Sequence, residues 1–169
     1  LSGFRTGRYG PADAWSAVWQ RILAWLAPSA EPVPLPWVPR ARPSFGADEA
    51  LPEESEREAL RRAADWVTAS RLLIASERAE PTRNLLRRGV EVAPLPSPGA
   101  PRGDGSLGIL EGYASAIRHD GSQMQRLPVR ADCQAETAMV LAMDAGTGGS
   151  AASADTAKRL LGFLYGPSG

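Results

Sequence analysis

Carboxylates and arginines gather between Glu111 and Glu136, and this is the part of the chain whose residue types could do chemistry. Its polar members are Glu111, Tyr113, His119, Asp120, Gln123, Arg126, Arg130, Asp132 and Glu136. Asp132 and Glu136 are four residues apart, so within a helix they lie on one face. Two carboxyl groups held that close can divide the acid and base roles of glycoside hydrolysis. The stretch therefore predicts a paired-carboxylate site, with Asp132, Glu136 and Glu111 as the catalytic candidates.

A structural interpretation of the same residues stays open. Asp132 can cap a helix, and Glu136 can pair with Arg130 or face solvent. Arg126 and Arg130 can clamp a substrate carboxylate or phosphate bidentately, or can hold neighbouring loops to acidic side chains. We keep Arg130 as a substrate-binding candidate.

The single histidine and the single cysteine limit the remaining catalytic chemistry. With only His119 and Cys133, the chain has no multi-histidine metal site, no cysteine-based zinc cluster and no intrachain disulfide, and we expect neither a metal nor a cofactor. His119 beside Asp120 could be a general base or substrate contact, although HDG is also an ordinary turn. Cys133 could be a nucleophile near a helix start, or a small buried residue.

The composition of the chain limits the classes of partner that it is expected to bind. The 169 residues are 43% hydrophobic and 22% charged, with nineteen basic residues against nineteen acidic ones. A chain with zero net charge has no overall field that would gather nucleic acid or an anionic membrane, and no apolar run reaches the roughly 18 residues of a membrane span. We expect neither nucleic acid nor membrane as a partner. Because the chain opens at Leu1 rather than at methionine, we also expect a piece of a longer protein.

The elements that position these residues are predicted from apolar residues at helical spacing. This spacing predicts a Trp-rich helix from Pro11 that Pro28 stops, a second helix from Glu53 to about Ser76, a third over 131–145 and a fourth over 155–165. Pro81 is expected to break the pattern after the second helix, with another helical turn or two over 82–88. Residues 89–108 are expected to form a loop, and 107–117 a short helix or strand.

The predicted fold is mainly α, with amphipathic helices joined by long Pro- and Gly-rich loops. Fifteen prolines and seventeen glycines account for the loops. The prolines are dense in 28–52, so the expected organisation is an N-terminal helical segment over 1–27, a Pro-rich linker over 28–52 and a helical domain over 53–169. Trp37 is large for a free linker and is expected to lie along a surface.

Two stretches resemble segments of known families. LSGFRTGRYGPADAWSAVWQRILAWL resembles the closing segment of a glutamine-amidotransferase-like domain of the trehalose-utilisation type. GILEGYASAIRHDGSQMQRLPVRADCQAETAMVLAM resembles the opening of an α/α-toroid domain of bacterial carbohydrate-active proteins. Together they cover under half of the chain. A complete toroid needs several more helical hairpins than this chain contains, and the amidotransferase-like part lacks its sheet.

The resemblance implies a glycoside hydrolase, or a fragment of one, that acts on a carbohydrate substrate. Glu111, Asp132 and Glu136 would be its carboxylates, with Tyr113 or Trp37 as sugar-stacking surfaces. A second hypothesis is a non-catalytic helical interaction or oligomerisation module. It depends on Trp- and Leu-rich helix faces that a short chain cannot cover by itself, and it predicts a homo-oligomer or a missing partner domain.

Overall fold

The computed structural model describes residues 12–28, 31, 35, 48–118 and 122–166. The chain divides into two compact units. The N-terminal unit comprises Leu1–Ala50 with Ser115–Ser122, and the C-terminal unit comprises Leu51–Ala114 with Gln123–Gly169. Each unit is described by itself.

The N-terminal unit contains α2, Ala12–Leu26, where the tryptophan periodicity predicts a helix. One more helical hydrogen bond follows before Pro28, from the Ala27 N–H to the Leu23 carbonyl at 2.8 Å. The Ser16 hydroxyl donates to the Leu35 carbonyl at 2.7 Å. That bond ties a point of the following Pro-rich stretch to the helix.

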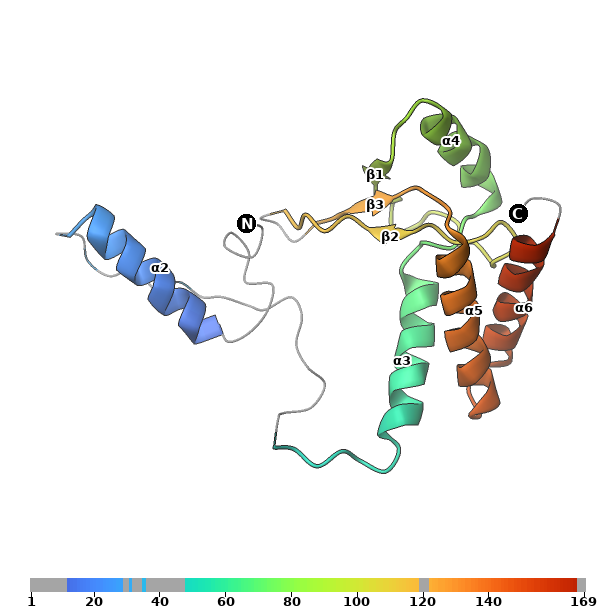
Figure 1. The fold of residues 1–169 in the computed structure, drawn as a ribbon, viewed down its shortest axis with the longest axis horizontal. Helices are drawn as coiled ribbons and strands as arrows, with labels where there is room; N and C mark the ends of the chain where they lie inside the picture. Colours follow the sequence, from blue (N-terminus) through green and yellow to red (C-terminus); the bar gives the residue numbers. More distant parts are fainter. Residues whose placement is uncertain (1–11, 29–30, 32–34, 36–47, 119–121, 167–169) are drawn as a thin grey trace. The chain divides into compact units, whose positions relative to one another are not determined.

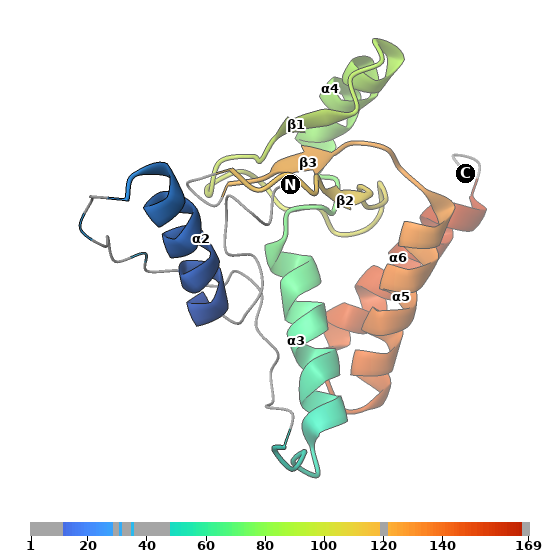
Figure 2. The same ribbon diagram turned by 60° about the vertical axis from the view of Figure 1, so that its left-hand side comes forward.

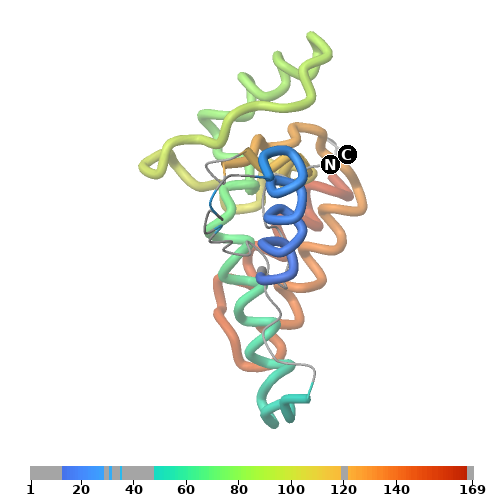
Figure 3. Tube along the Cα trace, turned by 90° about the vertical axis from the view of Figure 1, so that its left-hand side faces the viewer, coloured from blue at the N-terminus to red at the C-terminus, as the bar shows by residue number. Residues whose placement is uncertain are grey.

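In its described residues, the C-terminal unit combines four helices with one small sheet. The helices are α3 (Ser55–Ala69), α4 (Ser76–Arg87), α5 (Ala131–Gly146) and α6 (Ala151–Tyr165). Figures 1 and 2 show α3, α5 and α6 together on one side of the sheet and α4 on the other. Figure 3 follows the same path as a tube, with α3 and α4 reaching to opposite ends of the unit. The mainly α prediction is confirmed.

The sheet is antiparallel with strand order β1-β3-β2. Its strands are β1 (Val92–Pro94), β2 (Gly112–Tyr113) and β3 (Met124–Arg126). In β3, Arg126 is opposite both Val92 and Gly112. Residues 107–117 thus supply a strand, and the expected loop over 89–108 contains one as well.

The prediction of a single helix from Glu53 to about Ser76 is wrong. Helix α3 ends at Ala69, and Arg71 has a positive φ of 59°, which turns the chain. Leu72–Ala75 are then buried without helical structure, and Leu73 pairs with Ile109 in an antiparallel bridge. A short apolar run has no period that separates a buried extended segment from a helix, so the pattern alone could not place this boundary.

Pro81 does not end a helix, contrary to the prediction. It lies inside α4, on the exposed side, and the helix continues to Arg87. The proline cannot donate to the Glu77 carbonyl. Packing outweighs that loss, because Thr82 is buried and Leu85 and Leu86 pack against the core. Gly89, with φ of 74°, follows the helix end as expected.

The third and fourth helices form as predicted, with one change at each start. Helix α5 has Arg130 at its N-cap, and no side chain caps it; Asp132 instead accepts from the Cys133 N–H at 2.9 Å. Helix α6 begins four residues earlier than expected, because the Ser150 hydroxyl accepts from the Ala152 N–H at 3.1 Å and caps it. The two helices pack along their length.

Two fully buried glutamines complete the core between helices and extended segments. Gln134 in α5 accepts from the Ile109 N–H at 2.8 Å and donates to the Ile109 carbonyl at 2.7 Å. Gln125 in β3 donates to the Arg71 carbonyl at 3.0 Å and accepts from Arg78 at 2.7 Å. Both side chains are at most 1% exposed, among leucines such as Leu110, Leu127, Leu141 and Leu160. Each side-chain amide thus pairs backbone groups that would otherwise need a neighbouring strand: Gln134 pairs both groups of Ile109, and Gln125 pairs the Arg71 carbonyl.

Replacing Gln134 by leucine keeps its size and removes both bonds to Ile109. The buried N–H and C=O of Ile109 then lack partners, so we expect a loss of about 2–4 kcal/mol in the free energy of unfolding. Urea denaturation measures it. The exposed Glu136→Gln in the same helix is the control and should change stability by less than about 0.5 kcal/mol. A Gln134→Leu variant as stable as that control would refute this role.

Candidate functional site

An ion-pair cluster brings together several of the predicted site residues at the start of α5. Arg130 Nη2 lies 2.5 Å from Asp132 Oδ2, and Arg130 Nη1 lies 3.6 Å from Glu111 Oε1. Arg126 Nε lies 3.0 Å from Glu111 Oε2 and Arg126 Nη2 lies 3.8 Å from Glu91. Arg126 Nε is buried and not in hydrogen-bond geometry, so its contact with Glu111 is electrostatic.

Local structure explains why Glu111 meets Arg126 and Arg130, which lie 15 and 19 positions further along the chain. Glu111 directly precedes β2, and its N–H donates to the Pro128 carbonyl at 2.8 Å. Arg126 closes β3, which pairs with β2, and Arg130 is the N-cap residue of α5. The turn between β3 and α5 therefore carries both arginines past Glu111. The sequence indicated this gathering by residue density, and the strand pairing produces it.

The cluster favours the ionised form of Asp132. The two-point hydrogen bond from Arg130 is the main cause that lowers the pKa of Asp132, and the same pair raises the pKa of Arg130. A carboxylate with a lowered pKa suits the role of base or nucleophile and is the opposite of what a general acid needs near neutral pH. Of the two roles in glycoside hydrolysis, Asp132 therefore fits that of base or nucleophile and not that of general acid.

Asp132 and Glu136 share one face of α5 that is open to solvent. Both are exposed, and the stripe continues with Met139 and Met143, which are 57% and 50% exposed. The spacing of four, three and four residues places these four side chains in one row. Carboxylates beside an exposed apolar seam are typical of a surface for association more than of a closed catalytic cleft.

Tyr113 is partly buried and engaged in contacts with α3. Its hydroxyl donates to the Ser70 carbonyl at 2.5 Å, and its ring meets Trp66 edge-on with centroids 6.0 Å apart. Burial raises the pKa of Tyr113. Trp66 is 53% exposed and is the better stacking surface of the pair. Sequence reasoning missed it because its helical position carried no local signal.

The nucleophile hypothesis for Cys133 gains no support from its surroundings. Burial first, and then the neighbouring Asp132 charge, raise the pKa of the Cys133 thiol. The sulfur lies 3.8 Å from the Glu111 carbonyl. A protonated thiol is a poor nucleophile. The remaining candidates, Trp37 and His119, lie outside the described residues.

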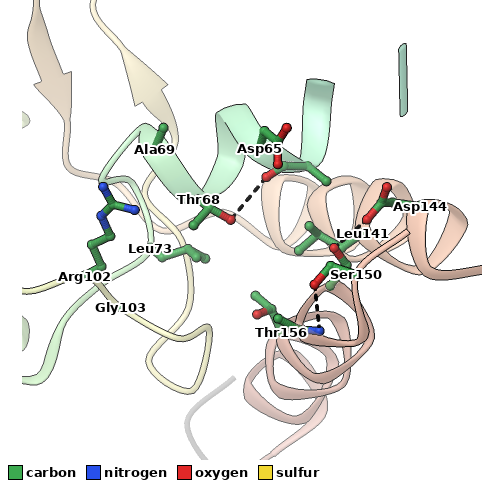
Figure 4. Close-up of a pocket in the computed structure, with 13 residues that line it drawn as sticks. Asp65, Thr68, Ala69, Leu73, Arg102, Gly103, Leu141, Asp144, Ser150 and Thr156 are labelled. Carbon is green, nitrogen blue, oxygen red and sulfur yellow. Dashed lines mark hydrogen bonds between the residues drawn. The ribbon is translucent and has the colours of Figure 1, made fainter. Parts of the chain in front are cut away.

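A cavity of about 400 Å³ lies elsewhere in the C-terminal unit, among α3, α5, α6 and the Arg102–Gly103 segment. Its polar lining consists of Asp65, Thr68, Arg102, Asp144, Ser150, Ser153 and Thr156. Figure 4 shows Arg102 and Asp144 on opposite sides of this lining. Sequence reasoning missed the cavity, because its residues come from four separate segments.

Within the described residues, no group of three or more histidine, cysteine, aspartate or glutamate side chains could hold a metal ion. No helix in that part of the chain is both long and apolar enough to cross a bilayer.

Comparisons with protein families, curated proteins and solved structures were made on the whole chain. None of the three gives a match.

The effect of Arg130 on Asp132 can be tested by titration. In Arg130→Gln we expect the pKa of Asp132 to rise toward the ordinary aspartate value of about 3.9, as followed by carboxyl ¹³C NMR. Because the folded-state pKa is lowered in the native protein, Asp132 contributes stability above pH 4 that is lost as the pH falls through that lowered pKa. The variant should lack this part of the acid dependence.

Asp104 is the internal control for that titration. Hydrogen bonds from Ser106 are the main cause of its lowered pKa, and Arg130 is not among the causes. Its pKa should stay low in Arg130→Gln. An Asp132 titration that does not move, or that moves together with Asp104, would contradict the assignment.

Proposed function

We propose that the chain is a non-catalytic helical oligomerisation module that self-associates through α2. The observation that carries the proposal is the exposed apolar surface of this helix. Trp25 is 79% exposed, Leu26 64% and Val18 41%. Large apolar side chains that are left open along one helix typically mark an association surface. The exposed carboxylates of α5 favour the same, non-catalytic interpretation.

The pattern of α2 favours a second copy of the chain as the partner. Taking Ile22 as the centre, apolar residues lie at three and four positions on each side: Val18 and Trp19 before it, Trp25 and Leu26 after it. In an antiparallel pair centred on Ile22, Val18 meets Leu26 of the other copy and Trp19 meets its Trp25. Such a face is complementary to itself, as a two-fold symmetric interface requires.

Charge does not oppose this pairing. Arg21 is the only charged residue between Val18 and Leu26, and it lies beside the apolar row, not within it. Full burial of a valine, leucine or comparable side chain is worth roughly 1.5–3 kcal/mol. Several such side chains per copy are enough to offset part of the entropy that association costs.

Light scattering coupled to size-exclusion chromatography tests the oligomer. We expect the full chain to be a dimer, and Trp25→Glu and Leu26→Glu to be monomers at the same concentration, because each places a charge in the apolar interface. Gln20→Glu, on the opposite, exposed side of α2, is the matched control and should remain a dimer. A native chain that is monomeric at every concentration would overturn the proposal.

A cross-linking pattern tests the antiparallel register in the same experiment series. In a Cys133→Ser background, Ile22→Cys alone should cross-link with a short bismaleimide, because Ile22 meets its own copy. Val18→Cys alone should not cross-link, whereas the Val18→Cys, Leu26→Cys double variant should. Efficient cross-linking of Val18→Cys alone would indicate a parallel pair.

A carbohydrate-active hydrolase is the second candidate. It is favoured by the convergence of Glu111 and Asp132 on Arg130, with Asp132 held as a carboxylate that suits a base or nucleophile. The family resemblance points the same way. Glu136 or Glu111 would then have to supply the acid, and Trp66 with Tyr113 the stacking surface for a sugar ring.

Hydrolysis of aryl glycosides and oligosaccharides by the purified chain tests this candidate. We expect turnover to fall at least about 100-fold in Asp132→Asn and Glu136→Gln, the range that a positioned acid or base supplies. The exposed Asp155→Asn in α6 is the matched control and should retain turnover. Absence of turnover, or turnover that neither substitution changes, would remove the hydrolase assignment.

A further inference from the structure

We propose that the cavity among α3, α5 and α6 binds a small molecule that carries a protonated amine, with Asp144 as its counter-ion. This inference concerns a different surface from α2 and does not depend on the oligomer. The cavity holds about 400 Å³ and is lined by hydroxyl groups and carboxylates as well as by Ala64, Ala69, Leu73, Leu141 and Ala152. That volume is within the range of small-ligand sites.

Asp144 is the feature that specifies the ligand. It is only 3% exposed, in the last turn of α5, and it lines the cavity. Its Oδ2 accepts a hydrogen bond from the Ser153 hydroxyl at 2.6 Å. In the described part of the chain, Oδ1 has no donor, and no arginine, lysine or histidine nitrogen lies within 4 Å of the carboxylate. A buried carboxylate without a positive partner is costly, so a cation is the natural complement.

The neighbouring loop cannot supply that partner. Gly149 lies directly against Asp144, and a Cβ atom there would be 2.3 Å from Oδ1. At this position the loop thus brings backbone and no side chain to the oxygen. Lys158 and Arg159 are on the exposed side of α6, and Arg159 pairs with Asp104 at 3.5 Å. No described basic side chain therefore pairs with Asp144, and Arg102, the basic residue of the lining, lies on the opposite side of the cavity.

The charge of the lining favours one positive charge. Asp65 and Asp144 carry two negative charges, and Arg102 carries one positive charge, so the lining has a net charge of −1. The hydroxyls of Thr68, Ser150 and Thr156 can accept from an ammonium group or bond to a hydroxyl on the ligand. With two carboxylates and no third acidic or histidine group beside them in the described chain, the lining lacks the ligand number that a divalent cation prefers.

Titration of the full chain with ethanolamine tests the proposal, and ethylene glycol is the neutral probe of the same size. We expect ethanolamine to shift the ¹⁵N–¹H signals of Gly149, Ser153 and Thr156 in a saturable way, and ethylene glycol to leave them in place. Sodium chloride at matched concentration controls for ionic strength. Equal shifts with both probes would mean that the cavity recognises hydroxyl groups and not the amine; no shift would mean that it holds water only. Either result overturns the proposal.

Variants locate the counter-ion. Asp144→Asn should weaken ethanolamine binding at least about tenfold, as expected when a charged hydrogen-bond partner is lost. Asp155→Asn, which changes an exposed aspartate outside the cavity, should bind like the native chain. If Asp144→Asn does not fold, as judged by circular dichroism, the Asp65→Asn variant takes its place. Asp65 is exposed at the lining, and its loss should weaken binding severalfold; native affinity in that variant would count against the charge argument.

Discussion

The burial of one extended segment, Leu72–Ala75, constrains the whole C-terminal unit. Its four residues are between 3% and 6% exposed, and they lie outside any helix that could pair their backbone groups. The backbone of 108–110 pairs with this segment through bonds from Ile74 to Gly108 and from Leu110 to Leu72, each 3.0 Å long. Buried peptide groups must have partners, so the position of 108–110 is fixed by this requirement. The N–H and C=O groups of Ile109 are paired in turn by the side-chain amide of Gln134 in α5.

The same chain of bonds positions the ion-pair cluster. Gln134 also donates to the Arg130 carbonyl at 3.1 Å, so the residue that fixes the extended segment fixes the start of α5 as well. From there the Arg130 side chain reaches Asp132 and Glu111. On the other side, Gln125 connects β3 to Arg71 and Arg78, next to the turn that ends α3. The surface charges thus lie where core amides place the backbone, and most of them are solvent-exposed pairs of small individual energy.

The two units present distinct kinds of surface. The cluster is occupied by its own arginines, which favours a structural or association role for its carboxylates. The cavity contains a buried carboxylate, Asp144, with which no described residue forms an ion pair, and this favours a ligand. In the N-terminal unit, α2 presents apolar side chains to solvent, which favours another protein surface. In the cluster the charges are paired, in the cavity a charge remains unpaired, and on α2 apolar area remains exposed. This difference determines the kind of partner that each feature suits.

The sequence by itself determined the features that depend on near neighbours along the chain. The periods of α2, α5 and α6, their ends at Pro28 and Gly166, and the density of charged residues between Glu111 and Glu136 can all be recognised locally. Only the tertiary structure decided that the apolar run Leu72–Ile74 leaves the helix, that α4 continues through Pro81, and that Asp144 rather than Glu136 lies buried beside a cavity. In these cases the outcome depends on burial against residues thirty or more positions away, or on packing between helices. A local pattern shows that a segment is apolar or charged, but the energy that chooses its conformation comes from partners that only the fold brings near.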